Sequence, residues 1–263
     1  MSAPFLLVIA LAGLCTGFAL IYFFCRRLDN YGFVDVAWAY SFTLLAVFFA
    51  CFGPGWPVRR LLCATLVGLW SLRLGTHLLR RVAGHHPVED GRYVQLRQDW
   101  AANFGSKMFG FFQLQAVSAV LLGLLFLLPA CNATTRLHPL ELAGAVLWLL
   151  AVLGETLADA QLAAFRKQAA GSGRVCDVGL WRYSRHPNYF FEWLVWVAYF
   201  VFVLPSPWGW IGIISPVSIL YLLLRVTGIP LTEQQVLRSK GEAYRRYQQT
   251  TSAFVPWFPT KLS

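Results

Sequence analysis

One eleven-residue segment, RYSRHPNYFFE at positions 182–192, gathers polar and charged side chains between two long apolar runs. A carboxylate beside hydrocarbon is costly, by about 2.5 kcal/mol or more at a bilayer centre for a comparable charge, so such residues usually face a site. Here Glu192 follows two arginines, a histidine and an asparagine. The segment therefore predicts a site for a polyanionic ligand at the mouth of a pocket beside a membrane.

The same segment has the features of a helix start. Pro187 is typical of a first helical turn, and Asn188 and Glu192, four residues apart, share one helix face. Helix N-termini present free N–H groups and a positive dipole end to anions, and Arg185 and His186 stand just before this one. We predict a phosphate or carboxylate site; the alternative is a set of cations that only anchors the chain at the membrane surface.

A second polar set lies in GETLADAQLAAFRK, where Glu155 and Asp159 are four residues apart and Arg166 follows seven residues later. This spacing places them near one helix stripe, either lining a ligand cavity or satisfying one another. Arg73 and Arg225 lie within or at the end of apolar runs, and each requires either an acidic partner or a polyanion.

A third candidate group could transfer protons. Asp35 lies in the apolar stretch YGFVDVAWAY, with Tyr40 nearby, and Tyr93 ends the polar loop HHPVEDGRY. A desolvated carboxylic acid or a tyrosine hydroxyl can polarise a carbonyl. The alternative for Asp35 is a buried acid that is hydrogen-bonded to backbone, and the alternative for the loop that ends in Tyr93 is an ordinary solvated loop.

The elements that position these residues belong to a membrane protein. Of the 263 residues, 57% are hydrophobic and only 13% are charged, against about 25% charged in soluble domains. The net charge of +10 does not indicate nucleic acid, because the basic residues cluster in loops beside apolar runs. The six cysteines show no ligand or disulfide spacing, so we expect no metal site.

We predict an all-α integral membrane bundle of about seven transmembrane helices with cytoplasmic loops and a C-terminal tail, since about 20 apolar residues cross a bilayer. It would be one domain, with a substrate-side part at 1–130 and a cofactor-binding half at 139–263. The polar, helix-prone tail, 227–263, contains FVPWFP, whose aromatics we expect at the interface. The predicted spans are 4–25, 33–52, 58–79, 109–130, 139–163, 189–204 and 208–226.

Most of the 22 Lys and Arg residues lie in the tail and in the loops after the first, third and fifth spans. The positive-inside rule then places the N-terminus outside and the C-terminus in the cytoplasm. The membrane would be a bacterial inner membrane or the endoplasmic reticulum.

The half at 139–263 resembles the C-terminal domain of the steroid 5-alpha-reductase superfamily, most closely an uncharacterised, mostly bacterial branch of membrane reductases. VDVAW (34–38) and EDGRY (89–93) are also similar to that branch. The RHPNY stretch is similar to sequences in sterol reductases and in isoprenylcysteine carboxyl methyltransferases as well, so it indicates the superfamily rather than the reaction. The stretches that carry the resemblance are LADAQLAAFRK (157–167), GRVCDVGLWRYSRHPNYFFEW (173–193) and GEAYRRY with FVPWFP (241–259).

The resemblance implies a reductase that takes hydride from NADPH and reduces a C=C bond in a lipophilic, steroid-like enone. We expect a monomer that contacts membrane lipid and that binds phosphates through arginines, whose planar forks match phosphate geometry. Some cofactor-binding residues are implied by the resemblance, and others are added by the spacing of polar residues described above. Together they are Asp159, Arg166, Arg174, Arg185, His186, Asn188, Glu192 and Arg225.

The N-terminal half departs from the steroid reductases, in which a Gln-Glu pair and a Tyr grip the substrate ketone. Asp35 is the nearest counterpart of the pair, and Trp70 stands where that Tyr would be. The group that polarises the acceptor therefore stays open among Asp35, Tyr40 and Tyr93.

Two other classes compete. The pattern of Glu233, Tyr244 and Tyr247 is similar to S-adenosylmethionine-dependent membrane methyltransferases of the isoprenylcysteine type, although that cofactor has no phosphates for the arginines to bind. A transporter or lipid-binding protein would use the intramembrane acids for coupling, but the sequence shows neither the repeats nor the broken-helix pairs common in transporters.

Overall fold

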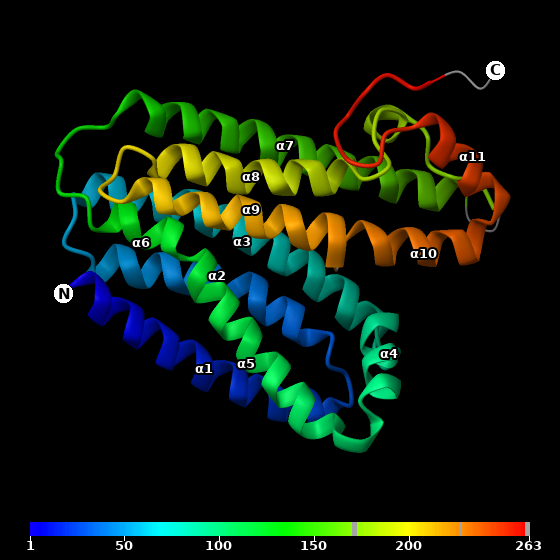
Figure 1. Cartoon of the computed structure of the whole chain (residues 1–263), viewed down its shortest axis with the longest axis horizontal. Coiled ribbons are helices and arrows are strands. Elements are labelled where there is room, and N and C mark those ends of the chain that lie inside the picture. The colour runs from blue at the N-terminus through cyan, green and yellow to red at the C-terminus, as the bar shows by residue number, and fades with distance from the viewer. Residues whose placement is uncertain (170–172, 227, 261–263) are drawn as a thin grey trace. The chain divides into compact units, whose positions relative to one another are not determined.

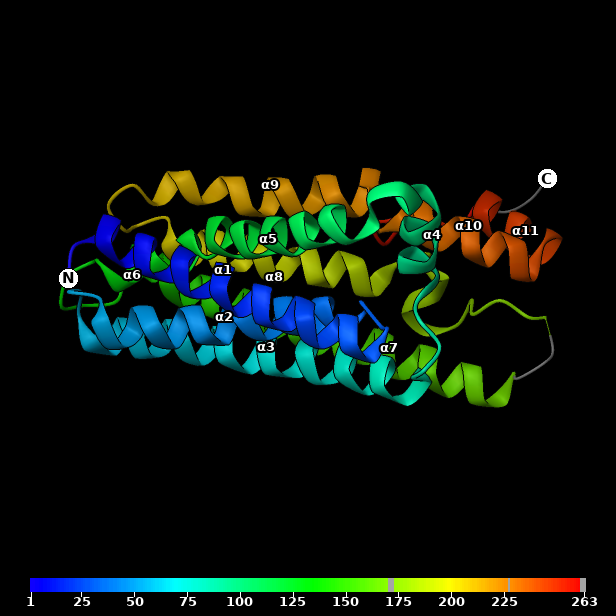
Figure 2. The same ribbon diagram turned by 90° about the horizontal axis from the view of Figure 1, so that it is seen from below.

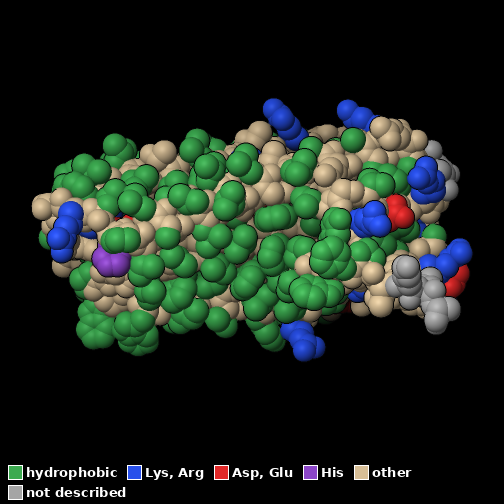
Figure 3. Space-filling view, turned by 90° about the horizontal axis from the view of Figure 1, so that it is seen from above, with side chains coloured by type: hydrophobic (Ala, Val, Ile, Leu, Met, Phe, Trp, Pro, Cys, Tyr) green, Lys and Arg blue, Asp and Glu red, His purple; other side chains and the backbone are tan. Residues whose placement is uncertain are grey.

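The computed structural model describes residues 1–169, 173–226 and 228–260 of the chain. In that part of the chain the elements are helices joined by loops, with no strand (Figure 1). Six helical stretches are long and apolar enough to cross a membrane, which confirms the predicted all-α membrane class. Large apolar side chains on the helix surfaces are widely exposed, Leu20 by 67% and Leu61 by 68%. Hydrophobic side chains cover much of the face shown in Figure 3.

The predicted count of seven spans is not confirmed. The stretch predicted at 189–204 forms helix α8, Pro187–Val203, with 17 residues. At 1.5 Å per residue such a helix extends roughly 26 Å, less than the ~30 Å of a hydrocarbon core. The six longer stretches run over Ala3–Leu28, Phe33–Phe52, Pro57–His85, Ala101–Ala130, Pro139–Gln168 and Gly209–Lys240.

The chain divides into two compact units. Unit 1 comprises Met1–Leu137 with Ser206–Gly209, and unit 2 comprises the described residues of His138–Pro205 and Trp210–Ser263. Polar clusters that are candidates for function occur in both units, so each unit is described by itself.

In unit 1, α2 packs along α3 and α1 packs along α5 (Figure 2). Pro57 starts α3 at a position where its missing N–H is harmless. Gly123 separates α5 from α6, so the predicted span 109–130 is two consecutive helices. The helices are α1 (Ala3–Leu28), α2 (Phe33–Phe52), α3 (Pro57–His85), α4 (Gly91–Asp99), the short 3-10 helix η1 (Ala101–Asn103), α5 (Phe104–Leu122) and α6 (Leu124–Ala130).

In unit 2, α7 (Pro139–Gln168) and α8 pack together along most of their length. A Cβ atom on Gly144 of α7 would lie only 2.7 Å from the backbone nitrogen of Phe202 on α8. Small residues at this interface let two helix backbones approach closely, and Ala151 and Ala158 continue it with no exposed surface. This close contact brings the polar end of α7 beside the first turn of α8.

The remaining elements of unit 2 carry the chain through its last apolar stretch and into the polar tail. The tail forms helices, as its composition predicts. The elements are η2 (Gly179–Arg182), η3 (Gly209–Ile213, whose first residue belongs to unit 1), α9 (Ile214–Tyr221), the π-helical turn η4 (Leu222–Val226), α10 (Ile229–Lys240) and α11 (Glu242–Thr250).

Candidate functional site

The first polar contact in unit 2 joins α7 to the start of α8. The Asn188 side-chain amide donates to the Asp159 carboxylate at 3.2 Å, and the Asn188 side-chain oxygen accepts from the backbone N–H of Tyr189. One turn further on, Glu192 accepts a hydrogen bond from the indole N–H of Trp196 at 3.0 Å. Two of the predicted cofactor residues, Asp159 and Asn188, are thus in direct contact, and Glu192 lies one turn along the same helix.

A second cluster is centred on one carboxylate of α10, and we call it the Glu233 clasp. Glu233 accepts from Arg185 Nε at 2.7 Å and from the side-chain amide of Gln248 at 2.8 Å. The Nε2 atom of His186 lies 3.2 Å away, and the Tyr244 hydroxyl donates at 3.3 Å. The clasp therefore ties the segment before α8 to both α10 and α11.

Arg185 is further held by two backbone carbonyls, since its Nη1 donates to Gln248 at 2.9 Å and to Thr251 at 2.8 Å. Its side chain is only 11% exposed. His186 is buried and stacks on the ring of Tyr189. Arg185 and His186 were predicted as phosphate ligands. In the structure their side chains instead contact other groups of the protein.

Two tyrosines of α11 reinforce this arrangement. Burial, followed by the charge of Glu233, raises the pKa of Tyr244. Burial also raises the pKa of Tyr247, whose hydroxyl donates to the carbonyls of Trp181 and Ser184. Both side chains therefore stay neutral hydrogen-bond donors at physiological pH, and Tyr247 fixes the loop that leads to α8.

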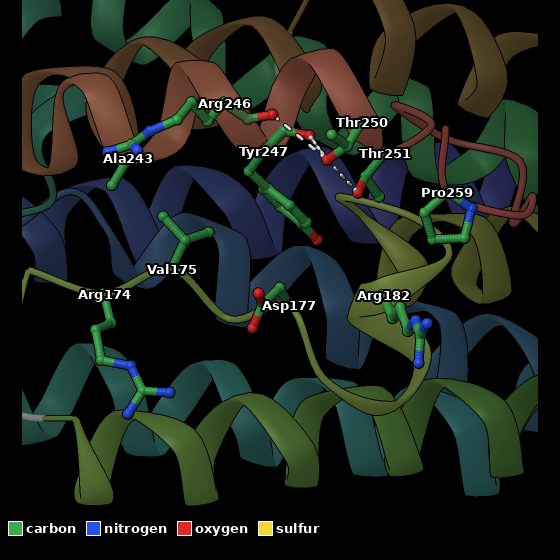
Figure 4. Close-up of a pocket in the computed structure, with 10 residues that line it drawn as sticks. All are labelled: Arg174, Val175, Asp177, Arg182, Ala243, Arg246, Tyr247, Thr250, Thr251 and Pro259. Atoms are coloured by element: carbon green, nitrogen blue, oxygen red, sulfur yellow. Dashed lines mark hydrogen bonds between the residues drawn. The ribbon is translucent and has the colours of Figure 1, made fainter. Parts of the chain in front are cut away.

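Beside the clasp lies a cavity of about 470 Å³, a size typical of small-molecule sites. Figure 4 shows Tyr247 projecting from α11 toward the loop that carries Asp177, with Arg174 and Arg182 on either side of that aspartate. The full lining consists of Arg174, Val175, Asp177, Arg182, Ala243, Arg246, Tyr247, Thr250, Thr251 and Pro259.

Three guanidinium groups, two threonines and one carboxylate make this cavity suited to an anion that also carries hydroxyl or amino donors. Guanidinium forks bind phosphate oxygens in pairs, and Asp177 could accept from a sugar hydroxyl. Of the arginines predicted to bind the cofactor, Arg174 lines the cavity. The lining given by the described residues does not include Arg166 or Arg225, which are exposed on α7 and on the π-helical turn.

The third polar cluster lies in unit 1 and joins the predicted VDVAW and EDGRY segments. Tyr93 of α4 donates to Asp35 of α2 at 2.8 Å, and Arg92 Nη2 binds the other Asp35 oxygen at 2.7 Å. Arg92 also binds Asp90 at 3.1 Å through Nε. Tyr40, the third candidate proton donor, pairs instead with Thr76 of α3 at 3.0 Å.

The electrostatics of this cluster have clear causes. Burial, together with the neighbouring Asp35 charge, raises the pKa of Tyr93 well above its usual value. Burial would raise the pKa of Asp90 as well, but hydrogen bonds and the charge of Arg92 outweigh it and lower that pKa. At neutral pH Tyr93 therefore stays neutral, and Asp90 is an ionised carboxylate paired with Arg92.

An adjacent ion-pair set fixes α4 to the turn between α1 and α2. Arg97 binds Glu89 at 2.7 Å and Asp29 at 2.7 Å, and its guanidinium lies over the Tyr31 ring. Glu89 in turn accepts from the backbone N–H of Tyr31 at 2.6 Å. These contacts join α4, which carries Tyr93, to the turn before α2, which carries Asp35.

Sequence reasoning did not assign Arg246 to the site, and it treated Glu233, Tyr244 and Tyr247 only as a pattern. One signal was present: tyrosines three residues apart share a helix face, and both are buried although most of α11 is polar. Glu233 carries no local signal, since its partner His186 is 47 residues away.

The fold and these clusters define a multi-pass helical membrane protein with polar sites on the ends of its helices. A family model described as "Protein of unknown function (DUF1295)" matches residues 21–251, and the chain belongs to that family. The match contains Asp35, Tyr93 and the Glu233 clasp.

A protein of Schizosaccharomyces pombe (strain 972), named "Uncharacterized protein C594.04c", is 27% identical over 263 aligned residues. The alignment covers 85% of this chain and 72% of the relative. No solved structure matches the chain significantly.

Proposed function

We propose that the protein is an NADPH-dependent membrane reductase that reduces a C=C bond in a lipophilic enone. The observation that carries the proposal is the cavity lined by Arg174, Arg182 and Arg246, because three guanidinium groups around one small-molecule space suit a ligand with several phosphates. The resemblance of 139–263 to steroid 5-alpha-reductases supports the same class.

The cavity changes which arginines we expect to bind the phosphates. Arg185 is used by the Glu233 clasp, so Arg182 and Arg246 join Arg174 in that role. Asp159 and Asn188, bonded to each other at 3.2 Å, would hold ribose or carboxamide groups together with Glu192. When bound, NADPH supplies the hydride, and the protein supplies position and electrostatics.

Within unit 1, we propose the Tyr93–Asp35 pair as the group that binds a substrate carbonyl. Tyr93 is neutral and buried, so its hydroxyl can donate a hydrogen bond or a proton to a developing enolate. Arg92 lies 2.7 Å from the second Asp35 oxygen and orients that side chain toward Tyr93. The ion pairs of Arg97 hold α4. Because Tyr93 lies on α4, they also position its hydroxyl as a donor.

The rival function is methyl transfer from S-adenosylmethionine. It is favoured by the Glu233 clasp, because the clasp engages both Arg185 and His186, and these two side chains then no longer support phosphate binding. The two functions differ in the cofactor that the cavity should accept.

The test is cofactor binding by the whole protein in detergent, measured by calorimetry with NADPH, NADH and S-adenosylmethionine. Arg246→Gln removes a cavity-lining charge. Arg245→Gln removes the same charge from the neighbouring position, where the side chain is 68% exposed and lies 3.5 Å from Glu242.

A hydrogen bond to a charged group contributes about 1.5–3 kcal/mol, so Arg246→Gln should weaken NADPH binding about tenfold to a hundredfold. Arg245→Gln should leave it nearly unchanged. Binding of S-adenosylmethionine without NADPH would establish the rival, and binding of none of the three would overturn both.

A further inference from the structure

The C-terminal segment Ser252–Pro259 is tightly tethered, yet it exposes its largest apolar side chains. Its backbone is held at Ser252, whose carbonyl accepts from Arg185 N at 2.8 Å, and at Trp257, whose N–H donates to the Tyr183 carbonyl at 2.9 Å. Trp257 is nevertheless 69% exposed and Phe258 78% exposed. Tethering of this kind holds the exposed rings in a fixed position.

The segment points one aromatic ring inward and the others outward. Phe254 is 8% exposed and packs against Phe190 and Trp193 of α8, with ring centres 5.7 and 5.9 Å away. Phe258 instead meets Trp257 at 6.4 Å and Tyr183 at 6.0 Å in edge-on contacts. We call the outward set, Tyr183, Val255, Trp257 and Phe258, the aromatic platform.

The platform lies where apolar helices of unit 2 reach their polar ends. Tyr183 stands four residues before Pro187, the first residue of α8. The loop that carries Tyr183 packs on α7, where the Trp181 indole donates to the Ala158 carbonyl at 2.9 Å. The last large apolar side chain exposed on α7 is Leu157, one position before that contact. The loop that carries Tyr183 therefore packs on α7 where the exposed large apolar side chains of that helix end.

We propose that the aromatic platform inserts into the headgroup region of the phospholipid bilayer and anchors this end of unit 2. Trp and Tyr favour that region because their rings are apolar and their N–H or O–H groups reach water. A tethered, exposed apolar patch requires a partner, and the stretch from Ser252 to Thr260 contains no acidic residue that lipid phosphates would repel. This inference is independent of the reductase proposal.

The anchor has a consequence for the cavity. The residues that precede Tyr183 and follow Thr250 also line it, among them Arg182, Thr251 and Pro259. Lipid contact at the platform would therefore hold one wall of the cavity in place.

The experiment uses the full chain labelled with fluorotryptophan, in nanodiscs of phosphatidylcholine and phosphatidylglycerol, observed by fluorine NMR. Trp257→Phe identifies the Trp257 signal by its loss and is conservative at so exposed a position. The probes are a phosphatidylcholine with a nitroxide high on its acyl chain and a water-soluble gadolinium chelate. Trp181, which is 7% exposed, serves as the internal reference and is assigned by Trp181→Phe.

The lipid nitroxide should broaden the Trp257 signal strongly, and the soluble chelate should broaden it little. The reverse pattern would mean that the platform faces water and would overturn the proposal. Insensitivity to both probes would also overturn it, because it would mean that protein covers the platform, either a second copy or another chain.

Discussion

Replacing Glu233 by Gln tests whether the Glu233 clasp holds unit 2 together. The substitution keeps the size of the side chain but removes the negative charge of the carboxylate. That carboxylate accepts hydrogen bonds from Arg185 Nε at 2.7 Å and from the Gln248 amide at 2.8 Å. Glu233 is 15% exposed and Arg185 is 11% exposed, so water replaces the lost interaction poorly.

The size of the effect follows from this burial. Removing one partner of a buried ion pair costs about 3–5 kcal/mol. Gln retains one oxygen that can still accept from Arg185, and neither partner of the pair is fully buried, so we expect about 3 kcal/mol of lost stability. For a unit of this size that loss corresponds to a fall in Tm of about 10 °C.

The assay is thermal unfolding of the whole protein in detergent micelles, followed by tryptophan fluorescence. Glu242→Gln is the matched control, because Glu242 is 66% exposed and lies 3.5 Å from Arg245, a surface pair that contributes at most about 1 kcal/mol. If both variants unfold at the same temperature as the native protein, the clasp does not stabilise the fold and the reasoning is refuted.

Three further substitutions test the remaining elements by thermal unfolding. Tyr93→Phe should lower stability by about 2 kcal/mol, the contribution of a hydrogen bond to a charged group. The folded-state pKa of Tyr93 is raised, so the stability of the native protein should also fall as the pH rises above about 10. The variant lacks the hydroxyl and should lose less stability over that pH range. The folded-state pKa of Asp90 is lowered, so this carboxylate stabilises the fold above about pH 3.8. That stability is lost as the pH falls through the lowered pKa, and Asp90→Asn should abolish this part of the pH dependence. Gly144→Ala should destabilise the protein by about 1–3 kcal/mol because its Cβ meets backbone of α8, whereas Gly13→Ala, with nothing within 4 Å, should not; equal effects of the two would contradict the close packing.

The helices were largely predictable because apolar length and proline or glycine at helix ends are local properties. The predicted span 33–52 has the same ends as α2, Phe33–Phe52. The stretch predicted at 189–204 is also a helix, Pro187–Val203, and its 17 residues leave the count of seven spans unconfirmed. Hydropathy located this helix, but it does not show whether a helix of that length crosses the bilayer.

The residues of the candidate sites were predictable where their own segments mark them, but their pairing was not. Asp35 in an apolar run and Tyr93 at the end of a polar loop were each candidates, and only the structure shows that Tyr93 donates to Asp35. Glu233 shows the limit, because its partner Arg185 lies 48 residues earlier in the chain, and the sequence does not show that α10 meets the segment before α8.

Two arginines of one motif show why a charge cluster does not by itself define a ligand site. Arg182 and Arg185 stand three residues apart, but the guanidinium of Arg185 is bonded to a carboxylate and two carbonyls, whereas Arg182 is exposed and lines the cavity. A guanidinium has five N–H donors, and those bonded within the protein are not available to a phosphate. The difference can be measured on one motif: Arg182→Gln should weaken cofactor binding with little change in Tm, and Arg185→Gln should lower Tm by several degrees through the clasp. If the two variants exchanged these effects, the division between a structural arginine and a ligand-binding arginine would be wrong.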